Sequence, residues 1–595
     1  MKMVTEEIMT KIEHLNSHPF HKRLRLDPLA GMLGVGILLR MLFFIYYQIN
    51  GNVYCDEAMT ILNARSIADN ATNIFGEKLP VYFDTWLYGG QSGFATYLIA
   101  FFIKIFGYNL TVSRIPILIF SILGLWAFYG LVKELLPNRK QTFFAITLAS
   151  ISPHFIYQSA WTLDCAFFPQ LFIIALYFLC KAVKTKKTPF YIVSMVFFGL
   201  CLHAYIASVL IVPIFLAILF IILLRKKETT FKATFISFLT IVLVSLPILL
   251  FGLVQIGVLH HVDLFGVSIE KMDSYNRASS FNIGANISLK ETILNFIYNF
   301  AYQFLHFFVP DTAIYRHLLG SAFEKIAGVN TATQIVANMF TFEDSISIFD
   351  FGHIFSGILL FAGFIILFVN RKKIPKLAFY VIITFATCLF IYGVLVKLRC
   401  YTLYRFSVFY YLFYILCGIA ATKIYDKIKL SKGIKQGFVA ICLILSVMLT
   451  CYTYTNIYTK EDSDFFGNTL NDCVKYAQDN EVQSITFFNS NQAVTNEREA
   501  VYLLFYNYDS KEDFVSLEET LRNRGTVSDF DMSKAQPEKI TEDGLWMYKT
   551  YYANAELTDD CYIFTSTTLS DEKAQEISGY SFKDFGYYAV LIRNE

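Results

Sequence analysis

The feature that most constrains this chain is a series of apolar stretches, each about 17–25 residues long, separated by short charged loops. A helix of about 20 apolar residues is long enough to cross the hydrocarbon core of a bilayer. Hydrophobic residues make up 55% of the 595 residues and charged residues only 16%, with a mean hydropathy of +0.47. Because backbone polar groups find no water inside a bilayer, such stretches must be helices. The pattern predicts a polytopic α-helical membrane protein.

Clusters of Lys and Arg recur between the apolar stretches and predict the topology. Cytoplasmic loops carry an excess of these residues, so we place every cluster inside, with residues 1–27 cytoplasmic and the C-terminus outside. About eleven spans result: 28–49, 114–134, 141–156, 165–181, 189–203, 205–224, 232–256, 350–370, 376–396, 405–422 and 435–456. The apolar stretch 92–107 is then an amphipathic or re-entrant segment on the outer face. No small-residue cleavage site follows the first span, which predicts an uncleaved anchor.

The membrane domain in this topology covers 28–456 and leaves three sizeable regions outside. These regions are the loops 51–113 and 257–349 and the C-terminal tail 457–595. The tail has an ordinary soluble composition, in which helical patterns alternate with short apolar runs typical of strands. The predicted elements are helices over 470–478 and 570–577 and strands over 484–488 and 587–592. This alternation predicts a small extracytoplasmic α/β domain.

Three carboxylates gather on the predicted outer face. Asp56 and Glu57 follow the first span closely, and Asp164 lies near the start of the fourth. Charges so close to a membrane are costly unless they have a function. Such a group predicts a general base and a residue that orients it. The structural alternatives remain open, because Asp is a favoured N-cap and acidic residues stabilise the first turn of a helix.

Basic residues on the outer face break the charge bias. The predicted outer loops are poor in Lys and Arg, yet Arg399 and Arg405 fall between the ninth and tenth spans, beside Tyr404. Arg binds phosphate in a bidentate manner and keeps its charge. The loop therefore predicts a site for a lipid-linked phosphate, with anchoring at lipid headgroups as the alternative. Arg40, within the first span, either has a functional role or pairs inside the helix bundle.

Aromatic residues form 17% of the chain, and most of them fit interface belts and helix packing. The first outer loop differs, because Tyr82 and Trp86 are followed closely by Gln91. Aromatic rings can stack on a sugar while an amide hydrogen-bonds to its hydroxyl groups. These residues predict a sugar-binding surface.

Several cofactor classes find no support in the sequence. There is no Walker loop, dinucleotide fingerprint or zinc-ligand spacing. We predict no required cofactor, treat a divalent metal as compatible with the sequence but not required, and predict no nucleic-acid partner. The eleven cysteines are mostly in or beside spans and suit packing, although Cys473 and Cys561 share the tail, where a disulfide is an open alternative.

A set of motifs in fixed order resembles membrane glycosyltransferases of the GT-C type. The closest group is the bacterial branch of the protein O-mannosyltransferase-like family, glycosyltransferase family 39. The motifs are Asp56-Glu57, Pro80–Phe83, Gly90–Ser92, Phe106-Gly107, Ser113–Pro116, Ser152-Pro153, Trp161–Cys165 and Phe349–Gly363. The resemblance covers roughly 28–425 and is best in the first 165 residues.

The resemblance implies a GT-C fold in the plasma membrane of a bacterium. It also implies transfer of a sugar from a polyprenyl-phosphate donor to an envelope acceptor, which is a glycan, a lipid or a protein. By motif, Asp56 is the expected base, and Glu57 and Asp164 shape or orient the site. Arg405 is expected to hold the donor phosphate, with Arg399, Tyr404 and Trp161 as further candidate substrate contacts.

The chain departs from known patterns at three points. A basic residue often found before the Trp of the second loop is replaced by Ala160, which weakens transfer of site details. The Lys-Pro element of aminoarabinose transferases is missing from the first loop, which argues against that assignment. No Asp-x-Asp motif follows the third span, unlike in oligosaccharyltransferases, which argues against an obligatory metal.

The resemblance implies a mechanism with a single displacement. Asp56 accepts a proton from an acceptor hydroxyl, which attacks the anomeric carbon opposite the lipid phosphate, and one displacement predicts inversion. The rival classes are a transporter or flippase and an envelope-sensing membrane protein whose tail, 457–595, binds a ligand. Transporters often have related halves and charges deep in the membrane. This chain shows no evident duplication and gathers its acidic residues at the outer face, which favours the enzyme.

Overall fold

The computed structural model describes residues 27–50, 53–84, 90–264, 266–272, 356–395, 403–452 and 468–482, together with shorter stretches, most of them in the C-terminal tail. The N-terminal segment 1–26, most of the predicted loop 257–349, and residues 396–402 lie outside the described residues.

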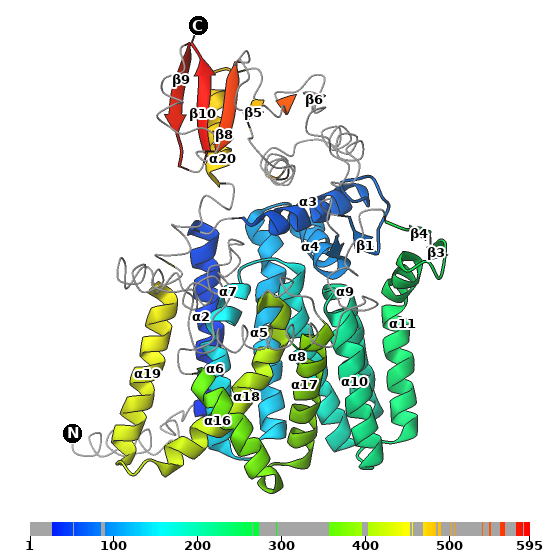
Figure 1. Cartoon of the computed structure of the whole chain (residues 1–595), viewed down its shortest axis with the longest axis vertical. Helices are drawn as coiled ribbons and strands as arrows, with labels where there is room; N and C mark the ends of the chain where they lie inside the picture. Colours follow the sequence, from blue (N-terminus) through cyan, green and yellow to red (C-terminus); the bar gives the residue numbers. More distant parts are fainter. Residues whose placement is uncertain are drawn as a thin grey trace, which may run out of the picture.

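Long apolar helices build the main body of the protein (Figure 1). In the described part, eight helices are long and apolar enough to cross a membrane. They are α2 (Pro28–Asn50), α5 (Leu110–Leu135), α8 (Asp164–Thr185), α10 (Ser208–Arg225), α11 (Phe231–Gln255), α17 (Lys376–Leu395), α18 (Leu403–Lys427) and α19 (Lys432–Tyr452). The shorter apolar helices are α4 (Gly93–Phe106), α9 (Thr188–Ala204) and α16 (Ser356–Val369). The predicted fold class, a polytopic α-helical membrane protein, is confirmed.

The predicted span 141–156 is not one continuous helix. It consists of α6 (Arg139–Ser150) and the short α7 (Pro153–Gln158). Pro153 lacks a backbone N–H and therefore suits the first turn of a new helix. The Ser152 hydroxyl caps α7 by accepting a hydrogen bond from the Phe155 backbone N–H at 3.4 Å. The break places α7 and the loop after it beside the start of α8.

Arg40 of α2 stabilises this break. Its guanidinium is fully buried and donates to the carbonyl oxygens of Ala149 and Ser150, at 3.2 and 3.1 Å. These carbonyls belong to the C-terminal end of α6, which has no helical partners for them and carries the negative end of the helix dipole. Arg40 also donates to Ser121 Oγ at 3.0 Å. The intramembrane charge therefore pairs inside the bundle, as the structural alternative proposed.

Helix α3 (Cys55–Asn70), α4 and a short hairpin lie across one end of the bundle (Figure 1). The hairpin pairs β1 (Tyr82–Phe83) with β2 (Gln91–Ser92) in antiparallel register, Tyr82 opposite Ser92. Helix α4 packs against α3, α5, α8 and α9. The first turn of α3 contains Asp56 and Glu57, where carboxylates interact favourably with the helix dipole.

The tail contributes a four-stranded sheet with the order β5-β8-β10-β9, at the same end of the bundle as α3 (Figure 1). Its elements are α20 (Asn468–Asp479), β5 (Thr486–Phe488), β8 (Cys561–Thr565), β9 (Tyr580–Asp584) and β10 (Tyr588–Arg593). Strand β5 is parallel to β8, and the other pairs are antiparallel. The remaining short elements are β3 (Val262–Leu264), β4 (Val267–Ile269), η4 (Arg371–Lys373), β6 (Glu538–Lys539) and β7 (Met547–Tyr548).

The sequence predicted part of this sheet. The helix over 470–478 and the strands over 484–488 and 587–592 correspond to α20, β5 and β10. The predicted helix over 570–577 lies outside the described residues, and β8 and β9 were not predicted. Cys473 and Cys561 are buried free thiols, and burial raises the pKa of Cys561 to about 12.

Candidate active site

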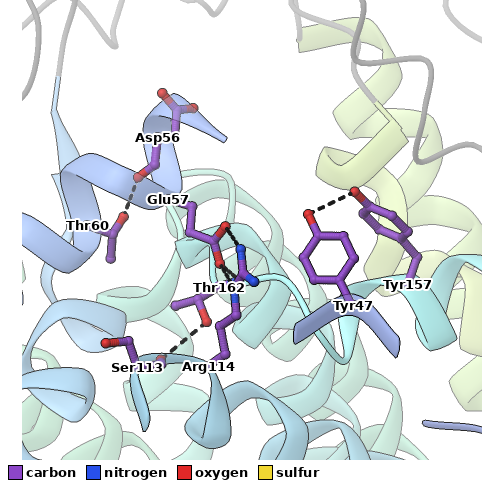
Figure 2. Close-up of polar contacts among 8 residues, drawn as sticks. All are labelled: Tyr47, Asp56, Glu57, Thr60, Ser113, Arg114, Tyr157 and Thr162. Carbon is purple, nitrogen blue, oxygen red and sulfur yellow. Dashed lines mark hydrogen bonds and ion pairs between the residues drawn. The ribbon is translucent and has the colours of Figure 1, made fainter. Parts of the chain in front are cut away.

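A buried ion pair lies at the α3 end of the bundle (Figure 2). Glu57 accepts from Arg114 of α5 through two parallel contacts, Nε to Oε1 at 2.8 Å and Nη2 to Oε2 at 2.7 Å. Both side chains are fully excluded from solvent. The backbone N–H of Thr162 also donates to Glu57 Oε1 at 3.0 Å. One carboxylate therefore joins α3, α5 and the loop that leads into α8.

Aromatic side chains enclose the ion pair on one side. The ring of Tyr47 lies 4.7 Å from the Arg114 guanidinium carbon, a cation–π contact. Figure 2 shows Tyr47 and Tyr157 beside the pair, and their ring centroids are 5.7 Å apart. Trp161 packs edge-on against Tyr54 and Tyr157. This packing excludes water, so the charges of Glu57 and Arg114 interact strongly.

Asp56 occupies a different environment from its neighbour. It is half-buried, and Figure 2 shows its carboxylate pointing away from the Glu57–Arg114 pair. Its backbone carbonyl accepts from Thr60 Oγ1 at 2.7 Å and from Gln91 Nε2 at 2.9 Å. Thr60 Oγ1 and Gln91 Oε1 are also 2.9 Å apart. The backbone at Asp56 is thus tied to the hairpin, while the carboxylate keeps partial access to solvent.

Asp164 meets the same hairpin from α8. The half-buried carboxylate accepts from the backbone N–H of Ser92 at 3.3 Å and from that of Cys165 at 2.6 Å. Asp164 is the first residue of α8, whose N-cap is Leu163, so Asp164 is not the N-cap that the structural alternative predicted. Its carboxylate lies in the first turn, where it interacts favourably with the helix dipole. The contact with Ser92 adds a second role. Because Gln91 binds the backbone of Asp56 and Ser92 binds Asp164, one dipeptide links the two acidic residues.

Two of the aromatic residues predicted to contact substrate are buried. The ring of Tyr82 stacks on Phe251 with centroids 5.1 Å apart, and its hydroxyl donates to the Gly90 carbonyl at 2.9 Å. Tyr82 is 3% exposed and Trp161 has no exposed surface. Both rings pack inside the described structure, and their role as substrate contacts stays a prediction. Gln91 is 6% exposed and its amide nitrogen binds the backbone of Asp56, and its contact with a sugar stays a prediction.

The hairpin requires glycine at position 90. Gly90 has φ +138°, and a Cβ there would lie 2.4 Å from Tyr82 Cε1 and 2.5 Å from the Phe83 carbonyl oxygen. We expect Gly90→Ala to lower the free energy of unfolding by about 2–4 kcal/mol through strain and overpacking. Thermal unfolding of the purified protein measures this. Gly252→Ala in α11, where no atom lies within 4 Å of the added carbon, is the matched control. Equal stability of the two variants would contradict the prediction.

The remaining predicted site residues lie outside what the structure describes. Trp86 and Arg399 belong to undescribed segments, and the side chains of Tyr404 and Arg405 are not described. Among the described residues, no group of three or more His, Cys, Asp or Glu side chains is placed to hold a metal ion. The roles proposed for Arg405, Arg399 and Tyr404 therefore stay predictions.

Arg114 is the main site residue that our reading of the sequence left without a role. It appears in the motif Ser113–Pro116, near the start of a long apolar helix. A cation at the predicted outer end of a span violates the positive-inside bias, as Arg405 does. A search for basic residues at the predicted outer end of every span would have identified Arg114. Its partner Glu57, 57 positions earlier in the chain, is not evident from local pattern.

The three carboxylates of the candidate site differ in what they can do chemically. A partly accessible carboxylate, Asp56, can accept a proton from a hydroxyl group brought to the α3 end of the bundle. Glu57 is fully paired with Arg114 and supports the helix that carries Asp56. Asp164, held by Ser92, supplies a second negative charge beside the same hairpin.

Comparison with known sequences gives one family match. Residues 92–251 match the profile of the family described as dolichyl-phosphate-mannose-protein mannosyltransferase. This confirms the resemblance predicted from the motifs over that segment, which is narrower than the predicted extent of 28–425. The segment contains Arg114, Thr162 and Asp164. The search of curated proteins gave no significant match to this chain.

Solved structures show distant similarity. The archaeal oligosaccharyltransferase AglB from Archaeoglobus fulgidus, solved with an inhibitory peptide and a dolichol-phosphate, is 16% identical over 72% of this chain, with a TM-score of 0.44. The Archaeoglobus fulgidus oligosaccharyltransferase tethered to an acceptor peptide is 14% identical over 82% of this chain, with a TM-score of 0.47. This chain spans 56% and 63% of those proteins. ArnT from Cupriavidus metallidurans, bound to undecaprenyl phosphate, is 10% identical over 94% of this chain and 98% of its own, with a TM-score of 0.39.

Proposed function

We propose that this chain, which matches the mannosyltransferase family over residues 92–251, is a GT-C type membrane glycosyltransferase. It moves a sugar from a polyprenyl-phosphate donor to an envelope acceptor on the outer face of the plasma membrane. One observation carries the proposal: the matched segment supplies Arg114, Thr162 and Asp164, which hold the Asp56–Glu57 turn and its hairpin at one end of the bundle. The donor class follows from the family's description, which names a lipid phosphate-linked sugar.

The distribution of charge supports the proposed orientation. Helices α5 and α18 run away from the α3 end and finish near Lys133 and Lys427 (Figure 1). Further basic residues occupy the turn between α16 and α17, which contains η4. Cytoplasmic ends of membrane proteins carry this excess. The α3 end, with Asp56 and Asp164, is then extracytoplasmic, and so is the C-terminal sheet.

In the proposed reaction, the acceptor hydroxyl loses its proton to the Asp56 carboxylate as its oxygen attacks the anomeric carbon. The bond from that carbon to the phosphate oxygen breaks, and polyprenyl phosphate leaves with the electron pair. Arg405 is proposed to stabilise the charge on the departing phosphate, an electrostatic contribution of the kind that often dominates catalysis. Glu57 keeps the first turn of α3 in place through Arg114 and Thr162.

A cellular experiment tests the proposed function. Cells lacking this chain are compared with cells expressing it, and both envelope glycans and lipid-linked sugars are analysed by mass spectrometry. We expect a polyprenyl-phosphate sugar to accumulate and one envelope component to lose that sugar. Purified protein in liposomes should then transfer the accumulated sugar with inversion at the anomeric carbon. An unaltered envelope would argue against the proposal, and a product with retained configuration would exclude the single displacement.

A further inference from the structure

Gln158 stands out among the polar side chains between α6 and α8. It is the last residue of α7 and it is fully buried, and among the described residues neither Oε1 nor Nε2 has a hydrogen-bond partner. Four other polar side chains of the same segment do have hydrogen-bond partners: those of Ser152, Tyr157, Ser159 and Thr162. Gln158 differs from these four side chains in that both polar atoms of its carboxamide are buried and unsatisfied in the part of the chain that the structure describes.

An unpaired amide in a protein interior costs free energy, because water that solvated it has been removed. An apolar side chain of similar size at this position would avoid that cost. Buried polar groups without partners are rare in folded proteins, and each calls for a specific explanation. A ligand that completes both hydrogen bonds of Gln158 is such an explanation.

A second unpaired amide lies on the neighbouring helix. Both amide atoms of Gln48 in α2 are buried and have no hydrogen-bond partner in the part of the chain that the structure describes. Helix α2 contacts α7, and the residues just before the two glutamines, Tyr47 and Tyr157, have hydroxyl oxygens 3.5 Å apart. Figure 2 shows these tyrosines beside the Glu57–Arg114 pair. Each of the two glutamines therefore follows directly, in the sequence, a tyrosine of the α2–α7 contact beside the candidate active site.

We propose that Gln158, together with Gln48, binds hydroxyl groups of the sugar on the lipid-linked donor, an inference that rests on the proposed function. A carboxamide donates through its nitrogen and accepts through its oxygen. A sugar hydroxyl also does both, so it satisfies both atoms. A phosphate oxygen only accepts and would leave Oε1 unpaired, which is why the sugar, and not the phosphate, is assigned to this site.

The test compares two lipids on the purified full-length protein. Undecaprenyl phosphate and undecaprenyl phosphate bearing a mannose or a glucose are titrated, and binding is followed by the rise in melting temperature. We expect the wild-type protein to bind one sugar-bearing lipid more tightly than the bare lipid. Gln158→Leu should weaken binding of the sugar-bearing lipid by about tenfold, the effect of one or two lost hydrogen bonds. It should leave binding of the bare lipid unchanged.

Stability without lipid provides an independent readout. Because Gln158→Leu removes an unpaired amide, its melting temperature should equal or exceed that of the wild-type protein. Thr147→Val is the matched control, since the Thr147 hydroxyl in α6 is also buried without a partner. That variant should bind both lipids as the wild-type protein does. Gln48→Leu repeats the binding test at the second glutamine. If Gln158→Leu fails to fold, the lipid preference of Gln48→Leu tests the inference instead.

The outcomes separate the two proposals. If the wild-type protein prefers a sugar-bearing lipid and both glutamine variants keep that preference, the inference is overturned and a buried water satisfies the amides. A marked loss of stability in both variants without lipid overturns it as well, because the amides then have a structural role. If the wild-type protein shows no preference for either sugar-bearing lipid, the proposed function itself fails.

Discussion

Asp56→Asn is expected to lower the rate of sugar transfer by about 10²–10⁴-fold, the usual contribution of a general base. Asparagine has nearly the same shape as aspartate but cannot accept a proton at neutral pH. The hydrogen bonds from Thr60 and Gln91 go to the backbone carbonyl of Asp56, so the variant retains them. Melting temperature and donor binding should therefore change little, while the rate of sugar transfer from the lipid-linked donor in liposomes should fall by that factor.

Asp69→Asn is the matched control for this prediction. Asp69 is exposed in the last turn of α3, so the variant makes the same change of charge on the same helix, away from the hairpin. We expect its transfer rate to match that of the wild-type protein. Full activity in Asp56→Asn would exclude Asp56 as the base. A similar loss in both variants would show that the charge of α3, and not proton transfer, is responsible.

The largest loss of stability is expected from breaking the Glu57–Arg114 pair. Either Glu57→Gln or Arg114→Met removes one charge and leaves the other buried without its partner. Disrupting a buried pair in this way typically costs about 3–5 kcal/mol. The loss should be large here, because both side chains have zero exposure and the carboxylate also accepts from Thr162. Thermal unfolding in detergent, together with the yield of folded protein, measures the effect.

Two comparisons make this prediction specific. The double variant Glu57→Gln with Arg114→Met removes both charges, so it should lose less stability than the two single losses added together. Asp27→Asn breaks the exposed pair of Asp27 with Arg139, which should cost about 0–1 kcal/mol. Additive single losses, or a loss at Asp27 as large as at Glu57, would contradict the buried-pair account.

The membrane helices were predictable because the bilayer leaves few alternatives. A stretch of about 20 apolar residues must satisfy its own backbone, and only a helix does so locally. The break between α6 and α7 was not predictable from the sequence, because it depends on a contact between residues far apart in the chain. The carbonyls freed at Ala149 and Ser150 are satisfied by Arg40, more than 100 positions away in the sequence. Hydropathy averaged along the chain does not indicate such a long-range contact.

The candidate site was predictable in its carboxylates but not in its supports. Topology alone placed Asp56 and Asp164 at one end of the bundle, and the hairpin residues Gln91 and Ser92 contact both. The burial of Tyr82 depends on Phe251, a residue of a distant helix. An aromatic residue in a loop cannot be assigned to binding or to packing until its tertiary neighbours are known.

The hairpin contacts bear on how such a protein changes over evolutionary time. Because β2 holds both Asp56 and Asp164, their separation is set within one small unit that includes α3 and the start of α8. Substitutions in loops that do not touch this unit can alter which acceptor is admitted without moving the carboxylates. A lineage can then exchange acceptors while the proton-transfer geometry stays as it was.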